Sequence, residues 1–249
     1  MLAANLAGNY HYLKGIEPYS SGVVAEEGYE IIHATLRRPL PWREGFARID
    51  ALLREAGRPR AALCGVELRS PAPFTRQGFI DFNRGYVELL AKWGLLLGED
   101  NPIARTNVAP TFAAPAEPSL YGCSFTEPAT TPGPRTFVVA GAGELRGGTL
   151  LEAPVVRPGD PSPEGMREKA GYVMRVMSKR LEGLGMAWAG VTAIDLYTAY
   201  PFQDWLREIV LETTGEAAIH GVRWFPSAPP IDELDFEMDV RGVRVEIVL

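Results

Sequence analysis

Apolar and polar positions in the first half of the chain switch between helical and extended spacing. Phe46, Ile49 and Leu52 recur at steps of three, and the run stops at Gly57, which is typical of an amphipathic helix with a glycine end. Alternating positions follow, then a second helical stretch and an extended section. These elements are predicted over residues 41–57, 61–70, 75–94 and 103–125. We therefore expect helices that pack on a sheet.

The second half repeats this order. Ser162 can cap the free N–H groups of a helix, Pro163 is tolerated at its first position, and apolar spacing continues to Gly185. A strand, a shorter helix and extended segments are predicted over 191–200, 201–213 and 214–249. A shift of 128 residues places Gly57 on Gly185, Val66 on Ile194 and Leu68 on Leu196. An internal duplication is the simplest explanation.

Each half also begins with a predicted strand pair. The pairs span 22–36 in the first half, and 135–145 with 153–158 in the second. Each unit is then β-β-α-β-α-β-β with its helices on one face of a mixed sheet, and the fold class is α+β. The proline-rich segment 127–135 is typical of a linker. We therefore predict one repeat over 1–126 and another over 136–249.

The glycine-rich stretch "FVVAGAGELRGG" (137–148) invites comparison with a dinucleotide-binding turn. The G-x-G-x-x-G fingerprint on Gly141 and Gly143 requires a third glycine, and the chain has Arg146 there. No helical pattern opens directly after the turn, as pyrophosphate binding requires. We therefore interpret the stretch as a β-hairpin whose glycines supply positive φ angles or allow another group to come close.

Composition and charge narrow the classes of function. The formal net charge is −6 and no run of Lys or Arg stands out, which disfavours nucleic acid as a partner. The two cysteines do not form a disulfide framework, and the three histidines lack metal-binding spacing, so no metal is expected. The chain shows neither a signal-peptide pattern nor a long apolar run. We expect a cytoplasmic protein with no membrane contact.

Several motifs carry a resemblance to a known family. "PYSSG" (18–22), "FIDFNRGYVELL" (79–90) and "NPIARTNVAP" (101–110) resemble the Rid (YjgF) superfamily of imine and enamine deaminases. In the second half, "VTAIDLYTAY" and "IDELDFEMDV" are the nearest stretches. With "YHYLKGI" and "HGVRW", the two-repeat chain is similar to the 2-aminomuconate deaminases. The resemblance implies tandem Rid-like (chorismate-mutase-like) repeats, a homotrimer, a small carboxylate substrate and no cofactor.

The same resemblance implies site residues. Arg105 would hold the substrate carboxylate, since a guanidinium grips a carboxylate with two parallel hydrogen bonds. Glu237 would position water and move protons, while Tyr19 and Gly141 would line the pocket. Neither repeat carries both Arg105 and its glutamate partner. We therefore predict a composite cleft that collects Arg105 and Glu237, within the chain or across a subunit boundary.

The acidic residues around Glu237 need a cation. By strand alternation Asp235, Glu237 and Asp239 point the same way, and such a cluster is costly to bury alone. In a composite cleft Arg105 would be that cation, and His220 and Arg223 in the second repeat are the alternative, which would leave Arg105 free for substrate. His220 and Arg223 are also predicted to contact the substrate.

These residues favour a deaminase that hydrolyses 2-aminomuconate or a substituted relative to the oxo acid and ammonia in aromatic-compound degradation. Two alternatives stay open. One is a chorismatase-like hydrolase, and the other is a non-catalytic metabolite-binding module, because fold alone does not determine function. The exact substrate, and whether one or both repeats carry a working site, also stay open.

Overall fold

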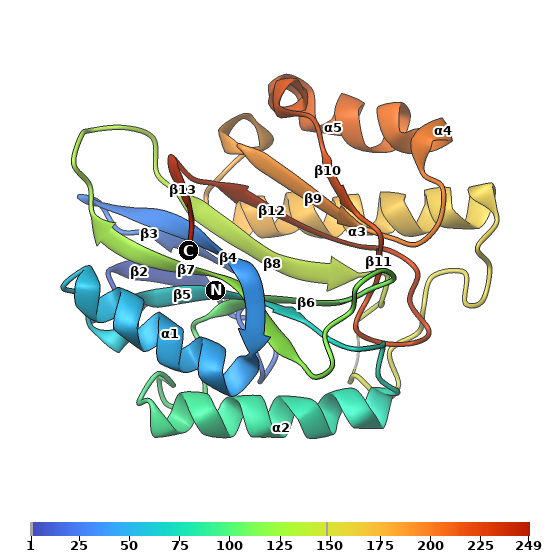
Figure 1. Cartoon of the computed structure of the whole chain (residues 1–249). Coiled ribbons are helices and arrows are strands. Elements are labelled where there is room, and N and C mark those ends of the chain that lie inside the picture. Colours follow the sequence, from blue (N-terminus) through green and yellow to red (C-terminus); the bar gives the residue numbers. More distant parts are fainter. Residues whose placement is uncertain (1, 148) are drawn as a thin grey trace.

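The computed structural model describes residues 2–147 and 149–249, which form two mixed β-sheets stacked between layers of helices (Figure 1). The six-stranded sheet runs in the order β11 (Ser227–Ala228), β6 (Ala104–Pro110), β5 (Leu63–Arg69), β7 (Ser119–Pro128), β4 (Tyr29–Pro41) and β13 (Val245–Val248). The seven-stranded sheet runs in the order β1 (Leu2–Asn5), β2 (Tyr10–Leu13), β3 (Gly22–Ala25), β8 (Phe137–Gly143), β12 (Glu237–Gly242), β9 (Ala193–Tyr197) and β10 (Arg223–Phe225). The α+β class with mixed sheets is confirmed.

Helices cover the outer face of each sheet (Figure 1). The longer helices are α1 (Trp42–Glu55), α2 (Arg76–Lys92) and α3 (Pro163–Gly183). The segment predicted as a shorter helix is α4 (Gln203–Trp205), a π-helical turn (Leu206–Leu211) and α5 (Glu212–Thr214), and short 3₁₀ turns span Arg60–Ala62, Trp188–Gly190 and Gly215–His220. Apolar side chains of α1 and α2 pack on the six-stranded sheet, and those of α3 pack on the seven-stranded sheet.

The predicted helix ends are confirmed by their capping geometry. The Ser162 side chain accepts a hydrogen bond from the Gly165 N–H at 3.1 Å and begins α3. Gly57 and Gly185 follow α1 and α3 with φ of 65° and 69°, a conformation that costs glycine little. Local sequence signals therefore account for where these helices start and stop.

The strand pairs were predicted wrongly. β3 and β4 follow one another in the chain but lie in different sheets, because β3 pairs with β2 and β8 while β4 pairs with β7 and β13. Residues 153–158 add only an isolated bridge between Leu145 and Val155. Hydropathy indicates that a segment is extended, but it does not identify the strand that will pair with it.

Strands from the two halves are interleaved. β1 to β3 join the sheet of β8, β9 and β12, whereas β11 and β13 join the sheet of the first half. Two self-contained sheets, one for each half, are therefore not formed, and the boundaries 1–126, 127–135 and 136–249 stay a prediction.

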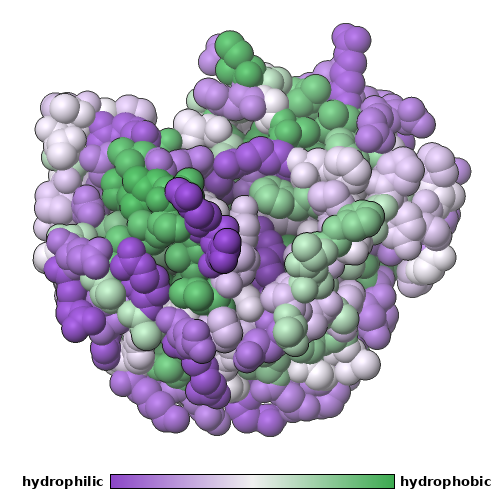
Figure 2. Space-filling model, in the orientation of Figure 1, coloured by the Kyte–Doolittle hydropathy of each residue, from purple (hydrophilic) through white to green (hydrophobic). Residues whose placement is uncertain are grey.

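The outer surface of the molecule is mostly hydrophilic in the view of Figure 2, with an apolar patch over β13, where Val245 and Val248 are exposed. Among the described residues, no helix combines the length and apolar character needed to cross a membrane.

Candidate active site

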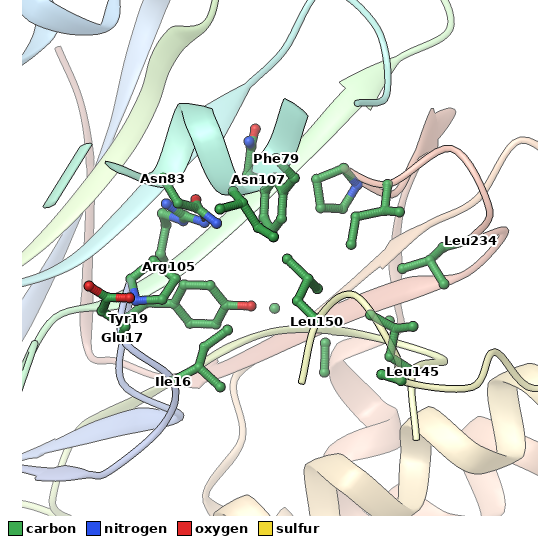
Figure 3. Close-up of a pocket in the computed structure, with 18 of the residues that line it drawn as sticks. Ile16, Glu17, Tyr19, Phe79, Asn83, Arg105, Asn107, Leu145, Leu150 and Leu234 are labelled. Atoms are coloured by element: carbon green, nitrogen blue, oxygen red, sulfur yellow. Dashed lines mark hydrogen bonds between the residues drawn. The ribbon is translucent and has the colours of Figure 1, made fainter. Parts of the chain in front are cut away.

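A cavity of about 750 Å³ lies against α2, α3 and the strands β6, β8 and β12 (Figure 3). Both halves of the chain contribute to its walls, which also include the turn 16–19 and the loop segments 145–147, 149–153 and 230–234. Tyr19, Asn83 and Arg105 stand at one side, and Leu145, Leu150 and Leu234 stand at the other. The cavity thus has a polar end and an apolar end.

Arg105 on β6 is anchored at one nitrogen and free at another. Its side chain is buried, and Nη2 donates to Asn83 Oδ1 at 2.7 Å. The ring centroids of Tyr19 and Tyr86 each lie 4.7 Å from its Cζ, so both rings pack on the cation. Among the described residues, buried Nη1 has no hydrogen-bond partner. An unpaired buried donor costs free energy, so this site is suited to receive an anion.

Asn107 supplies a second free donor beside Arg105. The two residues are separated by one position on β6 and therefore point to the same face. Asn107 Oδ1 accepts from Ser70 Oγ at 3.0 Å, whereas buried Nδ2 has no partner within the described residues. Arg105 and Asn107 together can accept a carboxylate.

Glu237 faces the same cavity from the first position of β12 and is 4% exposed. Burial raises the pKa of Glu237 well above its usual value, and the neighbouring carboxylates of Asp239 and Glu144 raise it further. The positive charges of Arg180 and Arg105 oppose this shift in pKa without a direct hydrogen bond to Glu237. The surroundings of Glu237 therefore disfavour its ionised form compared with a glutamate on the surface.

Gly141 gives Glu237 the space that it occupies. The β8–β12 pairing moves from Ala142 opposite Met238 to Val139 opposite Val240, so two β8 residues face one β12 residue. This is a β-bulge at Ala140 and Gly141. A Cβ added at Gly141 would overlap the Glu237 carboxyl group. The glycine therefore serves close approach, the second of the two uses expected for it.

Arg180 on α3 brings a second cation to the bulge. Its Nη1 donates to the carbonyl of Ala140 at 2.8 Å and to that of Gly141 at 3.2 Å. Burial lowers the pKa of Arg180 from its usual value, while the hydroxyl of Tyr19 and the carboxyl of Glu237 oppose that change in pKa. Glu237 is thus approached by cations from β6 and from α3.

A buried charge cluster holds the start of β12 in place. Lys169 on α3 is fully buried, forms an ion pair with Asp235 and lies 3.8 Å from Glu144. Glu144 accepts hydrogen bonds from the N–H groups of Asp235 and Phe236 at 2.6 and 3.2 Å. Burial raises the pKa of Glu144 to about 7. These contacts fix the backbone that leads directly into Glu237.

Arg76 connects the loop segments at the apolar end of the cavity. Its Nε and Nη2 form a two-pronged ion pair with Glu233 at 2.9 and 2.7 Å. Its Nη1 donates to the carbonyls of Leu150, Leu151 and Ala153 at 2.9 to 3.1 Å. One side chain thereby ties α2 to both loops that form the apolar wall.

A second set of charges lies between the sheets, and we call it the inter-sheet network: Glu67, Asp195, Asp239 and Arg241, with Arg223 and Glu246 at its rim. Arg241 pairs with Asp195 at 2.8 Å and with Glu246 at 2.9 Å, and Arg223 pairs with Asp195 at 2.7 Å. Asp239 accepts hydrogen bonds from Thr106 and Tyr197 at 2.7 and 2.9 Å. Each acid of this network is matched by cations or hydroxyl groups.

Comparison with known proteins identifies the family. The family model described as 2-aminomuconate deaminase CnbZ matches residues 2–247. The chain belongs to this family. It is also 41% identical over 245 residues to 2-amino-5-chloromuconate deaminase of Comamonas testosteroni, covering 97% of this chain and 96% of that protein. The predicted function, an aminomuconate-type deaminase in aromatic-compound degradation, is confirmed at the level of the family.

A crystal structure of a chorismatase at 1.08 Å resolution also matches, over 90% of this chain and 77% of that chain. The two are 14% identical and superpose with a TM-score of 0.43, which is too low to bear on the function of this deaminase.

In this member of the deaminase family, four of the six predicted site residues line one cavity within a single chain: Tyr19, Arg105, Gly141 and Glu237. His220 and Arg223 do not line it. His220 is exposed at the end of a 3₁₀ turn, and Arg223 is held by Asp195 and Glu246 in the inter-sheet network.

The expectation that His220 and Arg223 neutralise the acids around Glu237 was therefore wrong. Asp235 pairs with Lys169, and Asp239 lies 3.9 Å from Arg241. The packing of α3 on the sheet brings Lys169 to Asp235, and Arg241 lies two positions from Asp239 on β12 itself.

Sequence reasoning missed Arg180, Lys169 and Asn107. The sequence does indicate that Arg180 is unusual. It follows Val173 by seven positions and Met177 by three, so it lies on the apolar face of the predicted helix. A charged residue on a buried stripe needs a partner or a function. Among the described residues, no group of three or more His, Cys, Asp or Glu could hold a metal ion.

Proposed function

We propose that this protein hydrolyses the C–N bond of 2-aminomuconate, or of a substituted relative, to give the oxo acid and ammonia. The observation that carries the proposal is the pairing of an anion site with a buried carboxyl group in one cavity. Arg105 Nη1 and Asn107 Nδ2 are buried donors without partners among the described residues, and Glu237 faces the same cavity. An enamine carboxylate offers an anion and, next to it, an atom that must be protonated.

The first step is proton transfer to carbon. With the substrate carboxylate on Arg105, the protonated Glu237 gives its proton to the enamine carbon, and the C=C electrons form that C–H bond. The nitrogen lone pair then makes the C=N bond of an iminium ion. Glu237 becomes a carboxylate, which the positive charges of Arg180 and Arg105 stabilise.

The second step is hydration. The Glu237 carboxylate takes a proton from water while the water oxygen bonds to the iminium carbon, which gives a carbinolamine. Glu237 then returns this proton to nitrogen, the C–N bond breaks, and ammonia leaves as Glu237 takes the hydroxyl proton. The sum is enamine plus water to oxo acid plus ammonia, and Glu237 ends protonated as it began.

Ammonia release from freshly generated 2-aminomuconate tests the proposal. We expect enzyme-dependent release of one ammonia for each substrate consumed, and loss of this activity in Glu237→Gln. Substrate decay at the rate of the buffer blank would refute the function. Unchanged turnover in Glu237→Gln would refute only the assignment of the acid.

We also propose a homotrimer with a relationship to the Rid superfamily, on the basis of the sequence motifs. Light scattering at micromolar concentration should give three times the 27.2 kDa chain mass. A stable monomer would exclude the trimer.

A further inference from the structure

Arg180 lines the cavity, but in the proposed mechanism it only stabilises the Glu237 carboxylate and does not contact the substrate. Within residues 2–147 and 149–249, its hydrogen bonds all come from Nη1, to the carbonyls of Ala140 and Gly141. Those bonds fix the guanidinium plane and leave Nε and Nη2 free. Arg180 also lines the cavity with Arg105, Gly141 and Glu237.

The charge inside the cavity is unbalanced. Arg105 and Arg180 are both cations, and Glu237 is the acid that lines the inner part of the cavity with them. The other buried charges near the bulge are already matched, because Lys169 faces Glu144 and Asp235, while Asp239 accepts from Thr106 and Tyr197. At the exposed rim, Glu17 and Glu88 offset Arg84 and Arg146. The two guanidinium groups therefore outnumber the one acid that faces them, and this excess of positive charge is costly unless a ligand supplies an anion.

The two cations approach Glu237 from different elements. Arg105 comes from β6 beside Asn83, and Arg180 comes from α3 across the β8 bulge. Gly141 lies between them, since its carbonyl accepts from Arg180 and its N–H donates to Thr106, the residue after Arg105. Because Gly141 has no side chain, a planar conjugated chain can lie against the backbone there, beside the Glu237 carboxyl group.

We propose that Arg180 binds the distal carboxylate of the substrate, so that Arg105 and Arg180 hold a conjugated dicarboxylate at its two ends with Glu237 beside the chain. This inference rests on the proposed function for the identity of the substrate class. Arg180 would then be the residue that selects a dicarboxylate over a monocarboxylate. The second carboxylate can form charge-assisted hydrogen bonds only if a donor lies within hydrogen-bonding distance of it.

Two stable probes distinguish binding of one carboxylate from binding of two. Muconate and sorbate share a conjugated six-carbon chain, but muconate has two carboxylates and sorbate has one. Titration calorimetry on the wild-type protein should show muconate binding about ten- to a hundredfold more tightly than sorbate. Arg180→Met should reduce this preference to about threefold or less and leave sorbate binding unchanged.

Matched variants provide the controls. Arg175→Met removes an exposed arginine from the same helix and should keep the wild-type preference. Arg105→Met should weaken both probes, since each retains the carboxylate that Arg105 binds. Arg180→Lys keeps the charge and should show an intermediate preference, which also covers the case in which Arg180→Met does not fold.

The inference is overturned if the wild-type protein binds both probes equally, or if the Arg180 variants weaken both probes by the same factor. The latter result would assign Arg180 to support of the bulge alone. Failure of the proposed function would look different, because the preference for muconate would persist while no ammonia is released from 2-aminomuconate.

Discussion

The cavity and the inter-sheet network are both buried and both charged, yet they differ in how their charges are matched. In the network, Arg241 pairs with Asp195 and Glu246, and each acid has a cation or hydroxyl partner. In the cavity, Arg105 leaves Nη1 unpaired within the described residues, and Glu237 meets no cation directly. Matched charges hold the sheets together, whereas unmatched charges are available to a ligand.

The bulge at Ala140 and Gly141 joins the two regions. Thr106 accepts from the Gly141 N–H at 3.1 Å and donates to Asp239 at 2.7 Å. Asp239 in turn is the largest electrostatic cause of the raised pKa of Glu237 after burial. The inter-sheet network therefore supports the cavity both in geometry and in charge.

The largest effect is expected for Glu237→Gln. The substitution keeps the shape of the side chain but removes proton transfer, so kcat for ammonia release should fall by about 10²- to 10⁴-fold. Muconate affinity, measured by calorimetry, should stay within about threefold. Glu246→Gln, at the rim of the network, is the control and should retain near-normal turnover. A fall in muconate affinity as large as the fall in kcat would mean that Glu237 binds rather than catalyses.

A comparable effect, but on stability, is expected for Arg241→Met. The substitution removes the guanidinium group next to the buried carboxylates of Asp195 and Glu67. Loss of one partner from a buried ion pair typically lowers the free energy of unfolding by about 3–5 kcal/mol. The free energy of unfolding from urea titration measures this. A loss below about 1 kcal/mol would show that the inter-sheet network does not hold the sheets together, and the contrast with the cavity would be lost.

A smaller effect on activity is expected for Arg105→Lys. Lysine retains the charge but lacks the planar guanidinium that contacts Asn83 and a carboxylate together, so kcat/KM should fall by about tenfold or more. The unfolding free energy should change little, because the cation still lies beside the rings of Tyr19 and Tyr86. Near-normal kinetics in a folded variant would remove Arg105 from the site.

The smallest effect concerns pH. The pKa of Glu144 is raised to about 7 in the folded protein, so the folded state binds more protons than the unfolded state between the ordinary glutamate pKa and pH 7. Its contribution to stability is therefore present at low pH and is lost as pH rises towards 7. Glu144→Gln should reduce the decrease in melting temperature between pH 5 and pH 8 by a few degrees. An unchanged pH profile would show that Glu144 titrates at its ordinary pKa.

Sequence alone determined the ends of the longer helices and part of the site. Helix ends at Gly57 and Gly185 follow from local backbone preferences, and they appear as predicted. The motifs around Tyr19 and Arg105 pointed to a deaminase, and the family comparison agrees. The conflict of Arg146 with the dinucleotide fingerprint was also visible in the sequence, and among the residues that the structure describes no helix follows β8 directly.

Only the tertiary structure decided which strands pair and which charges meet. β3 joins β8 rather than β4, and β13 crosses to β4, because pairing depends on surfaces contributed by residues far apart in the chain. For the same reason the cations beside the acids are Arg180 and Lys169 on α3, not His220 or Arg223. Hydrophobic periodicity is encoded within a few turns of chain, whereas the partner of a buried charge is set by the packing of whole layers.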